Sequence, residues 1–424
     1  MTKNPLRVAP DLDLARTMFD ELERHTRVGR GITRDTYGAG ENFAHRLAEQ
    51  IARSLDLEIA TDAALNLYMT LPGRDRGLPR FITGSHMDSV PQGGNYDGAA
   101  GVVAGLAAVA GLKAQGIVPR RDVTVMAIRG EEAAWFNSSY IGSHAAFGKL
   151  AAEAFGVPRS DTRRPLADHM SEAGCDVAAL RHGKAHLSPD AIAAFVEVHI
   201  EQGPVLEQAG LPVGIVTGIR GCLRHRDARC FGEYAHSGAA PRLLRRDAVA
   251  ATAELVHRLG EACIHMESAG ADLVFTVGEL NTDPAVAAPS KVAGETRFVL
   301  DFRGLEEAVM RDASVVAARL ADEIGVRRNV RFALGDARYS YPATMDLPLR
   351  RHLGRLAGDL DIPAMELPSG AGHDAAVFAT FGVPTGMIFI RNSNGSHNPN
   401  EAMELADFAV AAGLLAAYFA HDDA

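Results

Sequence analysis

Cysteine is scarce in this sequence, with four residues among 424, and no two of them form a C-x-x-C pair. Such sparse and irregular spacing excludes both a disulfide framework and a thiolate metal site. The first ten residues also lack the apolar stretch that defines a signal peptide. We therefore expect a protein of the reducing cytoplasm.

Long hydrophobic runs and an excess of basic charge are missing as well. The longest apolar stretches, residues 99–112 and 408–420, are shorter than the roughly 18 to 20 residues that span a bilayer, so they predict buried helices. Lys and Arg total 43 against 53 Asp and Glu, which gives a formal charge of −10, and the basic pairs are scattered. Neither a membrane nor a nucleic acid is an expected partner.

Several common active-site motifs are absent. We find no G-x-G-x-x-G fingerprint, no Walker loop and no G-x-S-x-G nucleophile elbow. The composition is nevertheless that of a globular protein, with 47% apolar and 23% charged residues. At about 150 residues per domain, the length favours two to three domains.

Short apolar runs alternate with longer helical patterns, which predicts an α/β fold built from βαβ units. The clearest unit is a strand at 81–83, a Gly- and Ala-rich helix at 99–115 and a strand at 123–128. Further strands are expected at 194–198 and 385–390.

The texture changes in the middle of the chain. Here we expect Arg-rich strands, a helix at 247–261 and a strand at 297–303 whose Phe298, Leu300 and Phe302 face one way. The sequence thus predicts an inserted α/β domain over 214–333, and a first domain formed by 1–213 and 334–424.

Potential metal ligands follow the predicted strands, where sites form in open α/β sheets. The segment T-G-S-H-M-D-S-V-P-Q-G-G-N-Y-D-G holds His86, Asp88 and Asp97. Asp88 is placed to fix the tautomer of a ligating His86, and Asp97 could bridge two cations. The alternative is a structural histidine with an aspartate that caps the following helix.

Three further segments repeat this placement. Glu131 and Glu132 follow the strand at 123–128, and because neighbouring extended residues point apart, one could bind metal while the other addresses a bound water. His199 and His397 each follow another strand. Taken singly, a Glu pair is more often a solvated turn and a lone histidine is usually structural. Their joint occurrence at separate strand ends favours one site.

The motifs resemble those of the hydantoinase/carbamoylase amidohydrolases, a branch of the zinc aminoacylase and carboxypeptidase superfamily. The branch includes N-carbamoyl-L-amino acid hydrolases, β-ureidopropionases and allantoate amidohydrolases. The resemblance runs from about Arg30 to the carboxyl end and is carried by G-S-H-M-D-S-V-P-Q-G-G-N-Y-D-G, H-I-E-Q-G-P-V-L-E, S-G-A-G-H-D-A and G-S-H-N-P-N-E. It implies a mixed-sheet, zinc-peptidase-like catalytic domain, with the inserted domain as a lid and dimerisation domain.

The resemblance also implies a site for two divalent metal ions, Zn²⁺, Mn²⁺ or Co²⁺. One ion would be held by His86, Asp97 and His199, and Asp97 would bridge to a second ion held by Glu132 and His397. Glu131 would then act as the general base on a shared water.

In the inserted domain, His236 matches the family histidine that stabilises the oxyanion, usually in the partner subunit's site. Arg303 matches the arginine that binds the substrate carboxylate, and Gln202 and His373 match pocket positions. From the residues alone, His236 is a loop histidine and Arg303 forms a surface ion pair with Asp301.

Two positions depart from the family pattern. The usual Glu-Glu-Gly-Ser-Arg-Phe is here Glu-Glu-Ala-Ala-Trp-Phe, which places the only tryptophan, Trp135, beside the metal loop. Ser290 stands where the substrate-binding asparagine is usual.

The resemblance implies a homodimeric amidohydrolase that cleaves the C–N bond of an N-carbamoyl amino acid and releases CO₂, ammonia and the free amino acid. Alternatives of the same class are hydrolysis of allantoate or ureidoglycolate and hydrolysis of an N-acyl amino acid or dipeptide. A binding protein that has lost catalysis is the remaining alternative.

Overall fold

The computed structural model describes residues 6–421 and divides them between two compact units. Unit 1 comprises residues up to 217 together with those from 344 onward, and unit 2 comprises 218–343. The sequence predicts 214–333 for the inserted part. The difference arises because β8 (Val213–Ile219) pairs with a strand of unit 1, whereas β15 (Ala337–Ser340) pairs with β9 (Gly221–Phe231) of unit 2.

Unit 1 contains a nine-stranded mixed sheet in the order β16-β8-β18-β7-β5-β6-β4-β3, with β17 also paired to β8. The strands β5, β6, β7 and β18 are parallel neighbours, whereas β3, β4 and β8 pair antiparallel. Their bounds are β3 Glu58–Thr61, β4 Leu67–Leu71, β5 Arg80–His86, β6 Val123–Ile128, β7 Ile192–Ile200, β16 Ala343–Thr344, β17 Ala364–Ser369 and β18 Thr385–Ile390.

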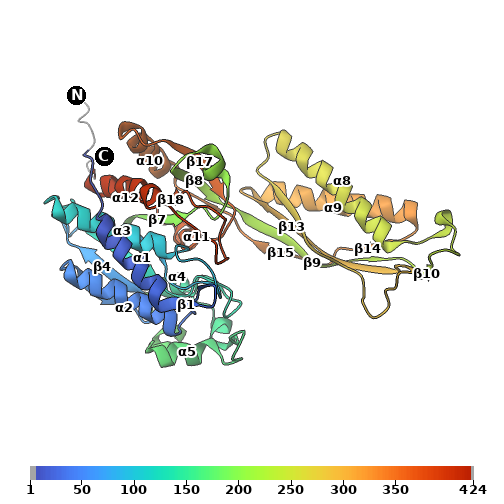
Figure 1. The fold of residues 1–424 in the computed structure, drawn as a ribbon, viewed down its shortest axis with the longest axis horizontal. Helices are drawn as coiled ribbons and strands as arrows, with labels where there is room; N and C mark the ends of the chain where they lie inside the picture. The colour runs from blue at the N-terminus through green and yellow to red at the C-terminus, as the bar shows by residue number, and fades with distance from the viewer. Residues whose placement is uncertain (1–5, 422–424) are drawn as a thin grey trace. The chain divides into compact units, whose positions relative to one another are not determined.

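Helices cover both faces of this sheet (Figure 1). Helices α1, α3 and α12 pack together over one face, where they share the main hydrophobic core, and α4 and α11 contact each other over the opposite face. The bounds are α1 Leu12–Thr26, α2 Ala39–Ser54, α3 Ala99–Ala114, α4 Ile141–Ala146, α10 Leu347–Asp359, α11 Asp374–Thr380 and α12 Leu405–Ala420. Shorter helices lie at α5 Leu166–Ala173, α6 Val177–Arg181 and α7 Val205–Ala209.

Alternation along β7 shows how the two faces differ in chemistry. Val196 and Val198 point into the main core beneath α3. On the opposite face, Phe195 stacks on Phe378 of α11 with ring centroids 3.8 Å apart, and Glu197 accepts a hydrogen bond from the Ala375 backbone N–H. One face is therefore apolar, while the other directs polar side chains toward the carboxyl end of the sheet.

The Gly- and Ala-rich helix α3 lies unusually close to the sheet. All of its residues from Ala99 to Leu112 are buried. A Cβ at Gly101 would lie 2.1 Å from the Val198 carbonyl oxygen and 2.7 Å from Ser85 Cβ. The small residues are thus required by backbone approach, although glycine is intrinsically unfavourable in a helix.

Unit 2 is an antiparallel sheet with two long helices on one face (Figure 1). The order is β11-β13-β9-β14, and α8 and α9 pack against the buried Phe298, Leu300 and Phe302 of β13. These three side chains face one way as the sequence predicts, whereas the sequence predicts only one of the two helices. The remaining bounds in unit 2 are α8 Ala248–Ser268, β11 Val274–Asn281, β13 Glu295–Gly304, α9 Glu307–Arg328 and β14 Arg331–Ala333. A short pair in unit 2 joins β10 Ala235–His236 to β12 Lys291–Val292. Another short pair, in unit 1, joins β1 Arg27–Val28 to β2 Gly31–Ile32.

The predicted α/β class with a mixed sheet and an inserted α/β part is confirmed. Within residues 6–421, no helix combines the length and apolar character needed to cross a bilayer. The four cysteines are free thiols.

Replacing Gly101 with alanine should destabilise unit 1 by roughly 1–3 kcal/mol, because the methyl group meets backbone that cannot move aside. Gly354, in the exposed part of α10, provides the matched control, since its Cβ would meet only Ile215 Cδ1 at 3.8 Å. Gly354→Ala should stabilise by up to about 1 kcal/mol. Urea unfolding of both variants checks this pair, and equal stabilities would contradict the close-packing argument.

Candidate metal centre

The candidate ligands of unit 1 gather at the carboxyl edge of its parallel strands, the edge at which α/β sheets form their sites. His86 ends β5, His199 lies near the end of β7, Glu132 follows β6 and His397 follows β18. Asp97 lies two residues before α3 begins. Ligand atoms of His86, Asp97 and His199 all lie within 4.8 Å of one another, as do those of Asp97, Glu132 and His397.

Hydrogen bonds set the orientation of both buried histidines. Nδ1 of His86 lies 3.0 Å from the Asp88 carbonyl oxygen, and Nδ1 of His199 lies 2.8 Å from the Ile200 carbonyl oxygen. Because a carbonyl oxygen only accepts, each Nδ1 carries the proton and each Nε2 presents a lone pair. The two Nε2 atoms lie 3.4 Å apart. Both rings are thus held in the form that binds a metal.

Asp97 faces the two groups with different oxygens. Its Oδ1 lies 3.2 Å from His199 Nε2 and 3.5 Å from His86 Nε2. Its Oδ2 lies 3.3 Å from His397 Nε2, and His397 Nε2 lies 3.4 Å from Glu132 Oε1. This arrangement suits a carboxylate that bridges two cations.

Two buried carboxylate oxygens of the site lack a hydrogen-bond donor among the described residues. Asp97 Oδ1 and Glu132 Oε1 are buried and have no hydrogen-bond partner among the described residues. An unpaired buried carboxylate oxygen is costly, so such atoms are normally satisfied by a hydrogen-bond donor or a metal ion. The donor set of imidazole nitrogen and carboxylate oxygen fits divalent zinc, manganese or cobalt. The residues present therefore fit the metal ions that the sequence implies.

Asp88 has a different principal contact from the one the sequence suggests. Its carboxylate Oδ1 lies 3.4 Å from His86 Nδ1, farther than its own carbonyl oxygen. The carboxylate instead accepts hydrogen bonds from the Glu131 N–H at 3.1 Å, the Glu132 N–H at 3.3 Å and the Thr36 hydroxyl at 2.6 Å. The carbonyl thus orients the histidine, while the carboxylate holds the loop of the two glutamates.

Glu131 is buried beside the two ligand groups but belongs to neither. Burial raises the pKa of its carboxyl group, and the neighbouring charges of Glu132 and Asp374 act in the same direction, whereas His86 lowers it. A carboxylate whose affinity for a proton is raised is suited to general base chemistry.

Gln202 and His373 also lie close to this centre. Gln202 Nε2 donates to Asp97 Oδ2 at 2.8 Å. The His373 ring lies 4.4 Å from that of His199, and His373 Nε2 lies 2.9 Å from Ser369 Oγ. Gln202 therefore contacts the bridging carboxylate directly, and His373 packs behind a candidate ligand.

Sequence reasoning did not single out two residues that support Asp97. The Ser396 hydroxyl lies 2.6 Å from Asp97 Oδ2 and 2.5 Å from Glu401 Oε2. Glu401 Oε1 accepts the backbone N–H groups of Tyr96 and Asp97 at 2.8 and 3.2 Å. Both residues lie in the G-S-H-N-P-N-E segment, so their proximity to His397 in the chain was the available signal.

Comparison with known proteins gives the same answer as the site geometry. The profile of Peptidase family M20/M25/M40 matches residues 82–421, which include every candidate ligand described above. The chain belongs to this family. The predicted enzyme class, a hydrolase of C–N bonds in linear amides, is thereby confirmed.

Similar proteins confirm that this chain resembles the hydantoinase/carbamoylase amidohydrolases. An N-carbamoyl-L-amino acid amidohydrolase of Geobacillus stearothermophilus is 36% identical over 91% of this chain and 92% of that protein. An allantoate amidohydrolase of Escherichia coli is 34% identical over 91% and 92%. The crystal structure of a hydantoinase/carbamoylase family amidase from Burkholderia ambifaria superimposes with a TM-score of 0.87 at 26% identity, covering 97% of each chain.

The remaining residues implied by this family resemblance lie in unit 2. His236 is exposed on β10, and its Nδ1 accepts the backbone N–H groups of Gly238 and Ala239 at 3.1 and 3.2 Å. The proton is therefore on Nε2, which can donate outward. The carbonyl of Ser290 accepts the Ser237 N–H at 2.8 Å, so His236 and Ser290 are near neighbours.

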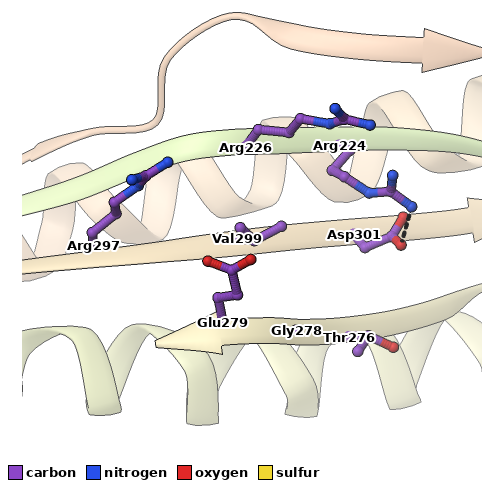
Figure 2. A pocket seen from close by; sticks show the side chains of 8 residues that line it. All are labelled: Arg224, Arg226, Thr276, Gly278, Glu279, Arg297, Val299 and Asp301. Carbon is purple, nitrogen blue, oxygen red and sulfur yellow. Dashed lines mark hydrogen bonds and ion pairs between the residues drawn. The ribbon is translucent and has the colours of Figure 1, made fainter. Parts of the chain in front are cut away.

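Arg303 lies on the face of β13 opposite the helices and forms the ion pair with Asp301 that the residues alone suggest, at 3.3 Å. Figure 2 shows Arg224 paired with the same Asp301, at 2.6 Å. This face is hollowed into a cavity of about 430 Å³, lined by Arg224, Arg226, Thr276, Gly278, Glu279, Arg297, Val299 and Asp301. Arg303 thus lies on a polar sheet face rich in guanidinium groups.

The unusual Trp135 is a buried support of the metal loop. Its indole N–H donates to the Ser89 carbonyl at 2.8 Å, and the Arg159 guanidinium lies 4.6 Å from the ring. Trp135 therefore ties the segment after β6 to the segment that carries Asp88.

Asp88→Asn should lower metal affinity by about 10- to 100-fold, the usual effect of removing support from ligands. The amide has a single acceptor oxygen, so it cannot hold both glutamate N–H groups and the Thr36 hydroxyl. Thr36→Val is the matched control, because it leaves both backbone contacts in place and should have a smaller effect. Competition with a chromophoric chelator measures both, and an unchanged affinity for Asp88→Asn would contradict the role of the carboxylate.

Proposed function

We propose that this protein is a two-metal amidohydrolase that cleaves an N-carbamoyl amino acid into CO₂, ammonia and the free amino acid. The observation that carries the proposal is the pair of ligand groups that share Asp97 through different oxygens. Similarity to a relative named N-carbamoyl-L-amino acid amidohydrolase supports the substrate class.

In this proposal His86 and His199 would hold the first ion, Glu132 and His397 would hold the second, and Asp97 would serve both. Divalent ions held there would supply Lewis-acid activation of the scissile carbonyl and of the attacking water. Asp88, Ser396 and Glu401 hold the ligands in place through the hydrogen bonds described above.

Glu131 is the proposed general base and later the acid. Its backbone is fixed by Asp88, and its buried carboxyl group has a raised pKa. It would take the proton of the attacking water and return it to the leaving nitrogen. Because Glu131 lies beside the metal ligands but belongs to neither ligand group, its carboxyl group is free to transfer a proton.

Recognition of the substrate carboxylate is assigned to Arg303, with Gln202, Ser290 and His373 as further binding residues. A guanidinium group binds a carboxylate through two parallel hydrogen bonds. Asp301 already occupies part of that fork, so a substrate carboxylate would compete with an internal partner. Ser290 has a shorter side chain than the usual asparagine and only one donor, which favours a substrate range different from that of the relatives.

The quaternary and cellular parts of the proposal rest on the family resemblance. We propose a homodimer formed through unit 2, in which His236 donates from Nε2 to the oxyanion in the partner subunit's site, and we place the enzyme in the cytoplasm. The fixed Nδ1 contacts of His236 support the donor role.

A substrate panel on metal-loaded protein tests the activity. We expect release of both ammonia and free amino acid from N-carbamoyl-L-amino acids, loss of turnover on chelation and recovery with Zn²⁺, Mn²⁺ or Co²⁺. N-acetyl amino acids and allantoate complete the panel, since the first yields no ammonia and the second is the substrate named for a relative. Turnover restricted to allantoate or to acyl compounds would reject the carbamoylase assignment, and full activity without metal would reject the two-metal site.

Glu131→Gln should reduce kcat by at least ~10²-fold while metal content stays the same. The amide keeps the shape of the side chain but cannot take a proton. Glu132→Gln is the matched comparison at the neighbouring position and should lower metal content instead. Elemental analysis alongside steady-state kinetics separates the two, and the reverse pattern would show that the two glutamates have exchanged roles.

A further inference from the structure

Tyr140 forms part of the wall of the metal cavity without belonging to the ligand set. The cavity has a volume of about 170 Å³ and is lined by Tyr140 together with Glu131, Glu132 and Gly372. The backbone N–H of Tyr140 donates to the Glu131 carbonyl at 3.1 Å, and the next residue, Ile141, donates to the Gly130 carbonyl at 2.8 Å. The phenol is therefore tied to the same short segment that carries the proposed base.

The backbone of Tyr140 is held in an uncommon conformation. With φ 60° and ψ 32° it lies in the left-handed region, which is unfavourable for a residue other than glycine. Ile141 begins α4 directly afterwards. Such strain persists only where the surrounding structure imposes it, and here it directs the ring into the cavity wall instead of along the helix.

The opposite side of the cavity leaves room for the hydroxyl group. A Cβ at Gly372 would lie only 1.8 Å from the Tyr140 hydroxyl oxygen. Glycine at 372 is thus required for this position of the ring. The hydroxyl is confined between the segment after β6 and the segment before α11.

The side chain of Tyr140 is half-buried and lines the polar cavity, and its hydroxyl forms no hydrogen bond within the described part of the chain. Burial raises the pKa of Tyr140, and the negative charges of Glu131, Asp374 and Glu197 add to the effect. The group is therefore a neutral hydroxyl at physiological pH, able both to donate and to accept. The hydroxyl is therefore available to a ligand bound in the cavity.

The chemistry of the substrate decides which role the hydroxyl plays. A neutral phenol can accept as well as donate, so its oxygen lone pairs are open to a donor in the cavity. A carbamoyl group offers such a donor, because it carries a terminal NH₂ where an acetyl group carries a methyl.

We propose that the Tyr140 hydroxyl oxygen accepts a hydrogen bond from the terminal NH₂ of the carbamoyl group and so selects ureido over acyl substrates. The inference rests on the proposed function and adds a specificity residue to it. A site that hydrogen-bonds a substrate N–H discriminates against an isosteric analogue without it, because its polar group is then left unpaired.

The test compares Tyr140→Phe with wild type on the N-carbamoyl and N-acetyl derivatives of the same amino acid. We expect kcat/KM for the carbamoyl compound to fall about tenfold, the effect of losing one hydrogen bond of about 1.4 kcal/mol, and that for the acetyl compound to change less than about twofold. If the acetyl compound is not turned over, its inhibition constant takes the place of kcat/KM. Metal content should be unchanged.

Two further variants guard against a general defect. Tyr68 lies on β4, and its hydroxyl donates a hydrogen bond to Asp62 at 2.9 Å. Tyr68→Phe removes this other tyrosine hydroxyl of unit 1 and should leave the carbamoyl-to-acetyl ratio unchanged. Gly372→Ala should lower that ratio in the same way as Tyr140→Phe, because its methyl group displaces the hydroxyl.

An equal loss on both substrates, or an unchanged ratio in Tyr140→Phe, would overturn the inference. If wild type turns over carbamoyl substrates while the ratio is insensitive to Tyr140, the proposed function stands and this inference alone fails. If wild type turns over none of them, both fail.

Discussion

The site is organised around one electrostatic requirement: Asp97, a buried carboxylate, must be neutralised by a positive charge. Both of its oxygens face imidazole nitrogens, and hydrogen bonds to backbone carbonyls hold His86 and His199 in the tautomer that offers no proton to them. Water is largely excluded, since Asp97 is 3% exposed. A divalent cation satisfies this arrangement by accepting the lone pairs of both Nε2 atoms and neutralising the carboxylate.

The same requirement explains the support around the centre. The fully buried Arg34 donates to the carbonyls of Met87 and Asp97 at 2.8 and 3.1 Å, and so ties both ends of the irregular segment between β5 and α3. Glu401 holds the same segment through backbone N–H groups. Rigid support of this kind lets the ligands keep their positions despite mutual repulsion, a state that would otherwise relax.

The sequence predicts best those features that depend on the local geometry of strands and helices. Strand ends and helix starts fixed where His86 and Asp97 would lie, because carboxyl ends of parallel strands share one edge. Phe298, Leu300 and Phe302 were placed on one face by period-two alternation. The contacts of Asp88 and the position of Tyr140 could not be read in this way. They depend on how the segment after β6 turns back on itself, which is set by tertiary hydrogen bonds such as Tyr140 to Glu131.

Three of the twelve non-glycine residues with positive φ in the described part of the chain lie where the chemistry is proposed. Tyr140, Gln202 and His397 all have positive φ, near 60°, although none is glycine. Gln202 donates to Asp97 and His397 lies against it, so two of the three strained residues converge on a single carboxylate. The cost is carried by a scaffold that buries α3 from Ala99 to Leu112 between sheet and helices. Close packing by small residues against the sheet thus provides the rigidity that holds unfavourable backbone and buried charge at its carboxyl edge.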